Sequence, residues 1–348
     1  MKKVSVIGHF AVGREYLNGQ TIKTRIVTGE LERVLGTDQV AIVDTHGGRK
    51  NLLKAPFQVF RSLKNSQNVA ILPAKNGLRV YAPLLSVCRR FFRGRKLHYV
   101  VIGGWLPQFL ETRKWLARAL MEFDCIYVEA NAMKTALEKQ GFSNVCVMPN
   151  CKDLTILSED ALPACGAAPY KLCTFSRVMR EKGIEEAVEA VKAVNNALGR
   201  QVFSLDIYGQ VDSAQTEWFE NLRNTFPASV RYGGMVPFDK SVEVLKDYFA
   251  LLFPTCYEGE GFAGTLIDAF SAGVPVVASD WKYNAEIVND CVGFVYPTGN
   301  QDAFVDVLMQ IANNPQLILD KKYPCLKEAE KYRIDRALRI LIDQIEGE

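Results

Sequence analysis

The sequence predicts an α/β protein of two consecutive domains, each a doubly wound parallel sheet with helices on both faces. Short runs rich in Val and Ile alternate with amphipathic segments along most of the 348 residues, a pattern typical of buried parallel strands separated by helices. This length is enough for two hydrophobic cores. Residues 157–169, rich in Ser, Asp, Pro, Gly and Ala, predict a linker between them.

Strands and helices are expected to alternate in both halves. The first half has strand candidates at Lys3–Ile7, Val40–Asp44, Val69–Pro73, His98–Ile102, Cys125–Val128 and Val145–Met148, and helical patterns at Thr21–Leu35, Phe57–Leu63, Ala82–Phe92, Phe109–Phe123 and Asn131–Gln140. The second half has strands at Lys171–Ser176, Phe203–Tyr208, Val230–Tyr232 and Phe249–Pro254, and helices at Ile184–Leu198, Thr216–Asn224 and Lys240–Lys246. We expect domains at residues 1–155 and 156–325, with the ligand in the cleft between them, outside the carboxyl ends of the strands.

Composition favours a soluble globular protein in a reducing compartment. Hydrophobic residues make up 48% and charged residues 23% of the chain, and its nine cysteines include no Cys-x-x-Cys pair. With three histidines in addition, neither a zinc site nor a disulfide framework is indicated. The first apolar run, Val4 to Ile7, is too short for an export signal, and no run of eighteen apolar residues follows. We therefore expect a cytoplasmic location.

Charge is distributed unevenly along the chain. Residues 1–150 carry 23 Lys and Arg against 10 Asp and Glu, a balance of +13, whereas the remainder has a balance of −10. The densest basic run, Arg89 to Lys96, includes Phe91 and Phe92. Such a run suits an anionic bilayer surface, where each basic residue contributes about 1 kcal/mol. The alternative is a solvated helix end with both aromatic rings in the core. No nucleic-acid module accompanies the charges, so no nucleic-acid partner is expected.

A glycine-rich loop, a short helix and a buried strand follow one another from Glu258 to Ile287. Gly259, Gly261 and Gly264 allow tight turns and leave backbone amides uncovered beside a ligand. The helix begins near Gly264, and its N-terminus suits a phosphate or a sugar oxygen. Glu260 precedes this helix and Asp268 lies within it, eight positions later. Two carboxylates that accept hydrogen bonds beside a glycine-rich loop suit a molecule with several hydroxyl groups and a phosphate. The alternative is a helix cap with one solvated acid.

This stretch resembles the Glu-x7-Glu signature of retaining GT-B glycosyltransferases of family 4, of the bacterial surface-polysaccharide type. The resemblance implies two Rossmann-like domains, with Glu260 on the donor-sugar hydroxyls and Asp268 on the ribose hydroxyls. It also implies a diphosphate near the amides of Gly261, Phe262, Ala263 and Gly264. Asp268 departs from the family pattern, because its side chain is one methylene shorter than the usual Glu. Glu258 is a rival for the first acid, but Glu260 has the eight-residue spacing.

Three further loops match the resemblance. Phe175 to Gly183 resembles the family's Gly/Ser-Arg-Leu-x-x-x-Lys-Gly motif, in which the cations at Arg177 and Lys182 neutralise the leaving diphosphate. Gly8 to Gln20 corresponds to a glycine loop against the donor phosphates, carried over here to Gly13. Gly234, Met235 and Val236 correspond to the segment whose backbone cradles the base. Taken alone, the loops of Gly13 and Gly234 also fit plain turns, and Arg177 and Lys182 also fit solvated side chains of a surface loop.

The acceptor side has fewer signals. His9 and His46 follow the first two strands and are candidates to meet an acceptor, whereas His98 is expected to be structural. Gly103, Gly104 and Trp105 occupy the neighbourhood of the family's acceptor-side histidine. The resemblance also implies that the last helix, about residues 326–348, packs back on the first domain. No Asp-x-Asp motif is present, so no metal or other cofactor is expected.

These observations predict a retaining hexosyltransferase that moves a sugar from a nucleoside-diphosphate sugar, with UDP favoured. The expected acceptor is a saccharide or a polyprenyl-linked saccharide in surface-polysaccharide biosynthesis, reached at the inner face of the cell membrane. Two alternatives remain open: a nucleotide-sugar epimerase of the same fold, and a catalytically inactive nucleotide-binding scaffold.

Overall fold

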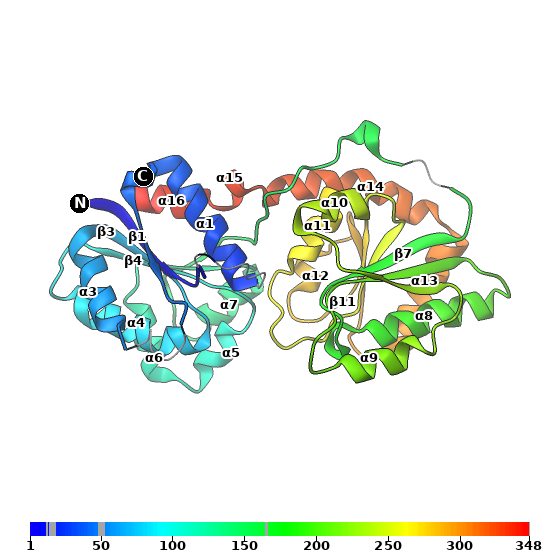
Figure 1. Ribbon diagram of the computed structural model, residues 1–348, viewed down its shortest axis with the longest axis horizontal. Helices are drawn as coiled ribbons and strands as arrows, with labels where there is room; N and C mark the ends of the chain where they lie inside the picture. Colours follow the sequence, from blue (N-terminus) through cyan, green and yellow to red (C-terminus); the bar gives the residue numbers. More distant parts are fainter. Residues whose placement is uncertain (12, 14–18, 48–52, 164–165, 348) are drawn as a thin grey trace. The chain divides into compact units, whose positions relative to one another are not determined.

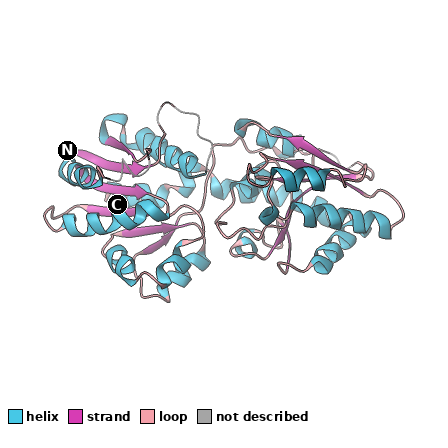
Figure 2. Ribbon diagram, turned by 60° about the horizontal axis from the view of Figure 1, so that its bottom comes forward, coloured by secondary structure: helices cyan, strands magenta, loops and turns pink. Residues whose placement is uncertain are grey.

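The computed structural model describes residues 1–11, 13, 19–47, 53–163 and 166–347. The chain forms two compact units (Figure 1). The first unit comprises Met1–Asp153 with Ile334–Glu348, and the second comprises Leu154–Arg333. Each unit holds one six-stranded sheet whose strands are all parallel. Helices cover both faces of each sheet (Figure 2), which confirms the predicted fold class.

The first unit is built outward from its first strand. Its strands, in the order β2-β1-β3-β4-β5-β6 across the sheet, are β2 (Val40–Asp44), β1 (Lys2–Gly8), β3 (Ser66–Leu72), β4 (Lys96–Val100), β5 (Cys125–Val128) and β6 (Val145–Val147). Its helices are α1 (Gly19–Leu35), α3 (Ala55–Asn65), α4 (Lys75–Arg89), α5 (Leu106–Glu111), α6 (Lys114–Met121), α7 (Asn131–Glu138), α15 (Ile334–Ala337) and α16 (Arg339–Glu346). Because β1 has β2 on one side and β3 on the other, the winding direction changes at β1, and side chains after β1 and β3 meet at one edge.

Two helices of the first unit differ from their predicted bounds. Helix α4 begins at Lys75, seven residues before the expected start, and contains Pro83. Prolines are usually found at the start of a helix, but here the ring lies within the helix. The expected helix Phe109–Phe123 is instead α5 and α6, separated where Arg113 leaves the helical region at φ −127° and ψ 59°.

The C-terminal segment is also broken, so the expected helix over 326–348 is wrong. Helix α14 (Gln316–Ala329) stays in the second unit. Arg333 is extended at φ −62° and ψ 144°, which ends the helical hydrogen bonding before α15 and α16 begin. Three buried side chains of α16 then join the core around β1, namely Leu341, Ile342 and Ile345. Each contributes about 1.5–3 kcal/mol by leaving water.

A row of buried polar side chains crosses the first sheet beneath α16. Asn68 on β3 donates to the Ile345 carbonyl at 3.2 Å and to the Lys3 carbonyl at 3.0 Å. His98 on β4 lies 3.0 Å from the Asn68 Oδ1 and 3.0 Å from the Tyr127 hydroxyl on β5. Burial lowers the pKa of His98 to about 4. His98 is therefore neutral at pH 7 and belongs to the structural core, as its position in a strand indicated.

The second unit repeats the same plan. Its strands, in the order β12-β11-β10-β7-β8-β9, are β12 (Gly293–Tyr296), β11 (Val276–Ser279), β10 (Ala250–Phe253), β7 (Tyr170–Phe175), β8 (Phe203–Tyr208) and β9 (Val230–Gly234). Its main helices are α8 (Ile184–Ala197), α9 (Thr216–Arg223), α10 (Ser241–Leu245), α11 (Gly264–Ser271), α12 (Asn284–Ile287), α13 (Gln301–Asn313) and α14. Strand β7 lies between β8 and β10, so the winding direction changes between β7 and β10.

The stretch expected as a linker lies within the second unit. Leu154 and Ile156 pack against its core, and the Leu157 amide donates to the Ser271 carbonyl at 2.8 Å.

In the described part of the chain, no helix has the length and apolar content needed to cross a membrane.

The burial of His98 predicts a pH dependence of stability. Its pKa is about 4 in the folded chain against 6.5 for an accessible histidine, so the unfolded chain binds more protons below pH 6.5. The stabilisation is complete above pH 6.5 and falls by about 3 kcal/mol as the pH drops towards 4. Urea unfolding followed at several pH values checks this. His98→Gln, which cannot titrate, should lower stability at pH 7 but show a shallower loss between pH 6.5 and 4. An equal slope in both proteins would contradict the assignment.

Candidate functional site

The site candidate of the second unit lies where β7 and β10 end. The loop after β7, residues 176–183, meets the loop after β10, residues 254–263, at the point where the winding direction changes. Ligands of doubly wound sheets bind at such points. Gly183 has φ 70°, and a Cβ there would lie 2.2 Å from the Pro254 carbonyl oxygen. Only glycine therefore permits this close approach of the two loops.

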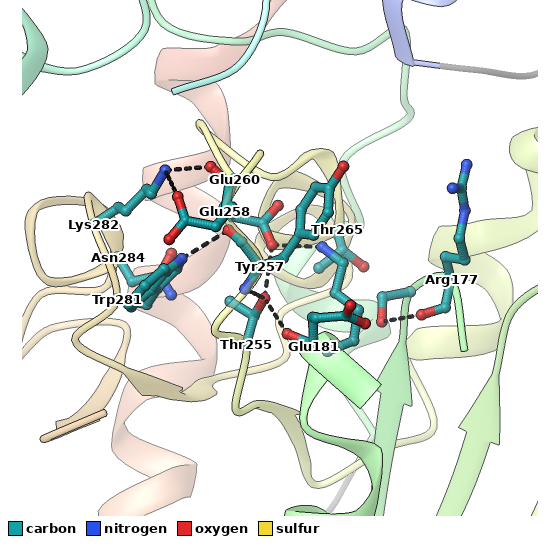
Figure 3. A network of polar contacts seen from close by, with 12 residues as sticks. Arg177, Glu181, Thr255, Tyr257, Glu258, Glu260, Thr265, Trp281, Lys282 and Asn284 are labelled. Carbon is teal, nitrogen blue, oxygen red and sulfur yellow. Dashed lines mark hydrogen bonds and ion pairs between the residues drawn. The ribbon is translucent and has the colours of Figure 1, made fainter. Parts of the chain in front are cut away.

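This approach joins two of the predicted site residues. Lys182 Nζ lies 2.5 Å from Glu260 Oε2, and the two side chains are 11% and 8% exposed. The Thr255 hydroxyl donates to the same carboxylate oxygen at 2.8 Å (Figure 3). The Lys182 ammonium also lies 5.0 Å from the centre of the Tyr257 ring. A cation and an acid predicted from separate motifs thus form one buried pair.

Thr255 links this pair to the rest of the sheet and was missed from the sequence. Its carbonyl accepts a hydrogen bond from the Ser279 hydroxyl at 2.6 Å, and Asn284 donates to the Ser279 carbonyl at 3.1 Å. The next residue, Cys256, donates its amide to the Glu181 carbonyl at 2.8 Å. These bonds hold the loop after β10 against β11 and against the loop after β7. The only signal in the sequence was a polar residue directly after a predicted strand.

The structure separates the two rival acids. Glu258 has a side chain that is 75% exposed and pairs with Lys282 at 3.5 Å. Glu260 is buried beside Lys182 and Thr255. Figure 3 shows Glu258 on the Lys282 and Trp281 side of the network. The geometry therefore favours Glu260 as the first acid, in agreement with its spacing from Asp268.

Helix α11 begins beside the buried pair. The Thr265 hydroxyl donates to the Phe175 carbonyl, which anchors the first turn of α11 at the end of β7. Gly261 and Phe262 are buried, and Ala263 and Gly264 are half-buried. The Phe262 ring packs edge-on against Tyr332 with centres 4.7 Å apart, so its side chain belongs to the core. What this segment can offer a ligand is its backbone amides.

Asp268 is buried on α11, beside the first residue of α10. Its side chain is buried, with the residue 3% exposed, and its Oδ1 accepts a hydrogen bond from Ser241 at 2.8 Å. Ser241 is the first residue of α10. One oxygen of this buried carboxylate is therefore already engaged by the neighbouring helix. The ribose contact of Asp268 stays a prediction.

Arg177 and the loop after β9 lie at the same edge of the sheet but outside the buried pair. The Arg177 guanidinium is 56% exposed and lies 3.5 Å from Asp212. Gly234 ends β9 at φ 80°, and its carbonyl accepts from the Gly209 amide at 2.9 Å. Met235 is 69% exposed and Val236 is half-buried. Among the described residues, no hydrogen bond or ion pair joins Arg177, Gly234, Met235 or Val236 to Lys182 or Glu260, so their donor-binding roles remain predictions.

In the first unit, the structure brings His9 and His46 together. His46 Nδ1 lies 3.0 Å from His9 Nε2, and the other nitrogen of His9 lies 2.8 Å from the Thr21 hydroxyl. Burial and then His46 lower the pKa of His9, while Asp44 opposes the shift. The two imidazole rings lie edge-on with centres 5.0 Å apart. Gly13 is exposed at φ 77°, and its neighbours 12 and 14–18 lie outside the described residues.

A match to a family model decides the identity of the fold and its site. Residues 169–314 match the model described as glycosyl transferases group 1. These residues include the loop of Lys182, the loop of Glu260 and helix α11. The second unit of the chain thus matches the group 1 glycosyltransferases. The predicted relationship to retaining GT-B enzymes of family 4 is therefore confirmed.

One curated relative and several solved structures are similar to this chain. The GtfA subunit of a UDP-N-acetylglucosamine–peptide N-acetylglucosaminyltransferase from Streptococcus agalactiae is 29% identical over 178 residues, which are 51% of this chain and 33% of that protein. The chain thus spans about a third of that relative's length. Anabaena HepE, solved with UDP and glucose, superimposes over 100% of both chains with a TM-score of 0.72 and 14% identity. Sucrose-phosphate synthase from Thermosynechococcus elongatus covers 100% of this chain and 98% of its own, with a TM-score of 0.74 and 16% identity. These structures share the GT-B fold.

The buried Lys182–Glu260 pair predicts that single and double substitutions will change stability unequally. Lys182→Met leaves the Glu260 carboxylate buried without its cation and should cost about 3 kcal/mol of unfolding free energy. Lys182→Met combined with Glu260→Gln removes both charges and should cost less than Lys182→Met alone. Urea unfolding of the two single variants and the double variant measures the coupling. Lys192→Met, which removes an exposed lysine on α8, serves as control and should change stability by less than about 0.5 kcal/mol. Additive effects at Lys182 and Glu260 would exclude the pair.

Proposed function

We propose that this chain is a retaining glycosyltransferase that moves a sugar from a UDP-sugar to a saccharide or lipid-linked acceptor in surface-polysaccharide biosynthesis. The observation that carries the proposal is the buried Lys182–Glu260 pair at the ends of β7 and β10, within the segment that matches the family. A UDP donor is supported by the named activity of the Streptococcus agalactiae GtfA subunit and by the UDP and glucose bound in Anabaena HepE.

The pair suits the recognition of a donor that carries both hydroxyls and a diphosphate. The diphosphate offers Lys182 a new counter-charge, while sugar hydroxyls can donate to the Glu260 carboxylate. Each buried charge therefore keeps a partner when the donor binds, which avoids the cost of leaving one uncompensated. The amides at the start of α11 and the Arg177 guanidinium add donors for the phosphate oxygens.

Retention is proposed to occur by attack on the face from which the diphosphate leaves. A double displacement would need Glu260 as a nucleophile, but one of its oxygens is already engaged by Lys182 and Thr255, which lowers its reactivity. The bond between the anomeric carbon and the phosphate oxygen breaks, and the acceptor oxygen bonds to that carbon on the same face. The departing phosphate oxygen takes the acceptor proton. Lys182, Arg177 and the α11 amides stabilise the charge that develops on the diphosphate.

Incubation with radiolabelled UDP-sugars, with and without bacterial lipid extract, tests this function. A transferase gives a labelled acceptor, an epimerase releases an altered free nucleotide sugar, and an inactive scaffold turns over nothing. Lys182→Ala should lower kcat/KM by about 100-fold, because one charge on the leaving group is then left unneutralised. Lys192→Ala is the matched control and should keep full activity. Transfer that Lys182→Ala leaves unchanged, or that a chelator abolishes, would count against the mechanism.

We further propose that the first unit docks on the inner face of the membrane. Phe91 is 82% exposed, which excludes the alternative that both aromatic side chains lie in the core. Phe92 instead packs edge-on against Phe60 with ring centres 5.3 Å apart. Arg90 and Arg93 flank this aromatic pair and are exposed. An exposed aromatic ring between cations matches the interface of an anionic bilayer.

Sedimentation with phosphatidylglycerol vesicles tests the membrane contact. Arg93→Ser should weaken binding about fivefold, because one basic residue near an anionic surface contributes about 1 kcal/mol. Phe91→Ser should also weaken binding, and the weakening should persist at high salt because it removes apolar contact. Tyr323→Ser, which removes a partly exposed ring from the second unit, is the control. Binding that neither Phe91→Ser nor Arg93→Ser alters would rule out this surface.

A further inference from the structure

Three cations gather around two aromatic rings at the carboxyl edge of the first sheet. Lys75 and Arg79 lie in the first turns of α4, directly after β3. Trp105 and Phe109 follow β4, and Arg113 lies between α5 and α6. Strands β3 and β4 are neighbours, so the sheet brings these segments together. We call Lys75, Arg79, Trp105, Phe109 and Arg113 the cation–aromatic cluster.

The two rings of the cluster form a fixed platform. Trp105 and Phe109 are each 9% exposed, and their rings meet edge-on with centres 5.1 Å apart at 89°. The Trp105 indole donates to the Ile102 carbonyl at 2.8 Å. Because both rings are buried and one is hydrogen-bonded, they offer a fixed surface to Lys75 and Arg79, which are exposed, and to Arg113, which is half-buried.

Each cation of the cluster lies against this platform. Lys75 Nζ is 5.7 Å from the centre of the Trp105 ring. The guanidinium carbons of Arg79 and Arg113 are 5.2 Å and 4.0 Å from the centre of the same Phe109 ring. Arg113 also donates to the Phe109 carbonyl at 2.9 Å. The two guanidinium groups thus share one aromatic ring as a contact.

The charges of the cluster are not balanced by acids. Across the described residues, no carboxylate forms an ion pair with Lys75, Arg79 or Arg113. Other cations of the unit are paired, such as Arg89 with Asp124 at 3.1 Å. The sequence gives the reason, because residues 45–110 contain twelve Lys and Arg and no Asp or Glu. Like charges held together repel, and a contact with an aromatic face contributes only about 0.5–1 kcal/mol each.

We propose that the cation–aromatic cluster binds the phosphate or diphosphate group of the acceptor. Three cations match the charge of such a group, and two guanidinium forks match the geometry of its oxygens. The N-terminus of α4 lies beside them and also favours an anion. The inference rests on the proposed function, and it assigns the acceptor to the class of phosphorylated saccharides and isoprenoid diphosphates. His9 follows β1, the strand next to β3, so the cluster and His9 belong to one edge of the sheet.

Calorimetric titration of the full chain with inorganic pyrophosphate tests the site, with the donor site first saturated with UDP. We expect pyrophosphate to bind the UDP-saturated protein, and Arg79→Gln with Arg113→Gln to weaken that binding at least tenfold. UDP affinity should stay unchanged in this double variant. Lys139→Gln, which removes an exposed lysine directly after α7, is the control and should bind as the unmodified chain does. No binding in the presence of UDP, or equal binding by the double variant, would overturn the proposal.

A second pair of variants protects the test against a folding defect. If loss of the Arg113 bond to Phe109 prevents folding, as circular dichroism would show, Lys75→Gln with Arg79→Gln removes two charges from the surface of α4 alone. The same tenfold weakening is expected, and unchanged binding would overturn the proposal. If UDP does not bind at all, the proposed function fails separately, because pyrophosphate titration of Lys182→Ala still reports on the cluster.

Competition identifies the source of the phosphate. Geranyl diphosphate should displace pyrophosphate if the acceptor is an isoprenoid diphosphate, and glucose 1-phosphate should displace it if the acceptor is a soluble sugar phosphate. Displacement by neither would indicate an adventitious ion only and would overturn the proposal. Phosphatidylglycerol vesicles provide the last arm. If the double variant loses binding to vesicles but keeps binding to pyrophosphate, the cluster is a membrane contact and the proposal is wrong.

Discussion

The contact between the loops that follow β7 and β10 is the constraint on which the candidate donor site depends. Gly183 lies so close to the Pro254 carbonyl that no side chain fits between them. This approach places Lys182 against Glu260, and Thr255 fixes the same carboxylate oxygen. A buried ion pair contributes little net stability, because desolvation offsets the attraction between its charges. The pair is therefore better explained as an arrangement of charge for binding than as a stabilising element.

The two units hold their cations in different ways. In the second unit the buried ammonium of Lys182 is paired with the carboxylate of Glu260. In the proposed complex the diphosphate of the donor contacts Lys182, and its sugar hydroxyls donate to Glu260. In the first unit the cations of the cluster rest on buried rings, and among the described residues none of them forms an ion pair with an acid. In the proposed complexes, Lys182 and Glu260 exchange contacts with each other for contacts with the donor, whereas the cation–aromatic cluster gains an anionic partner. This difference follows the uneven distribution of charge along the sequence.

The departures from the predicted elements have identifiable physical causes and functional weight. The predicted helix began at Ala82, but α4 begins at Lys75 and so includes Arg79. Arg113 divides a predicted single helix and in doing so faces the Phe109 ring. The two errors conceal the cation–aromatic cluster, because its members were assigned to a loop and to the middle of a helix. Local patterns could not reveal it, since β3 and β4 must pair before these segments meet.

The sequence by itself determined the fold class, the order of most strands and the relationship to the group 1 glycosyltransferases. Runs of Val and Ile predict the fold class, because strands buried on both faces of a parallel sheet are almost entirely apolar. The motifs that contain Lys182 and Glu260 predict the family, because each is a short continuous segment of the chain. Only the tertiary structure decided that Glu260 rather than Glu258 lies beside Lys182, that Asp268 is buried against Ser241, and that Thr255 supports the pair. These facts depend on contacts between residues distant in sequence, and such contacts form only when the sheet brings the strand ends together.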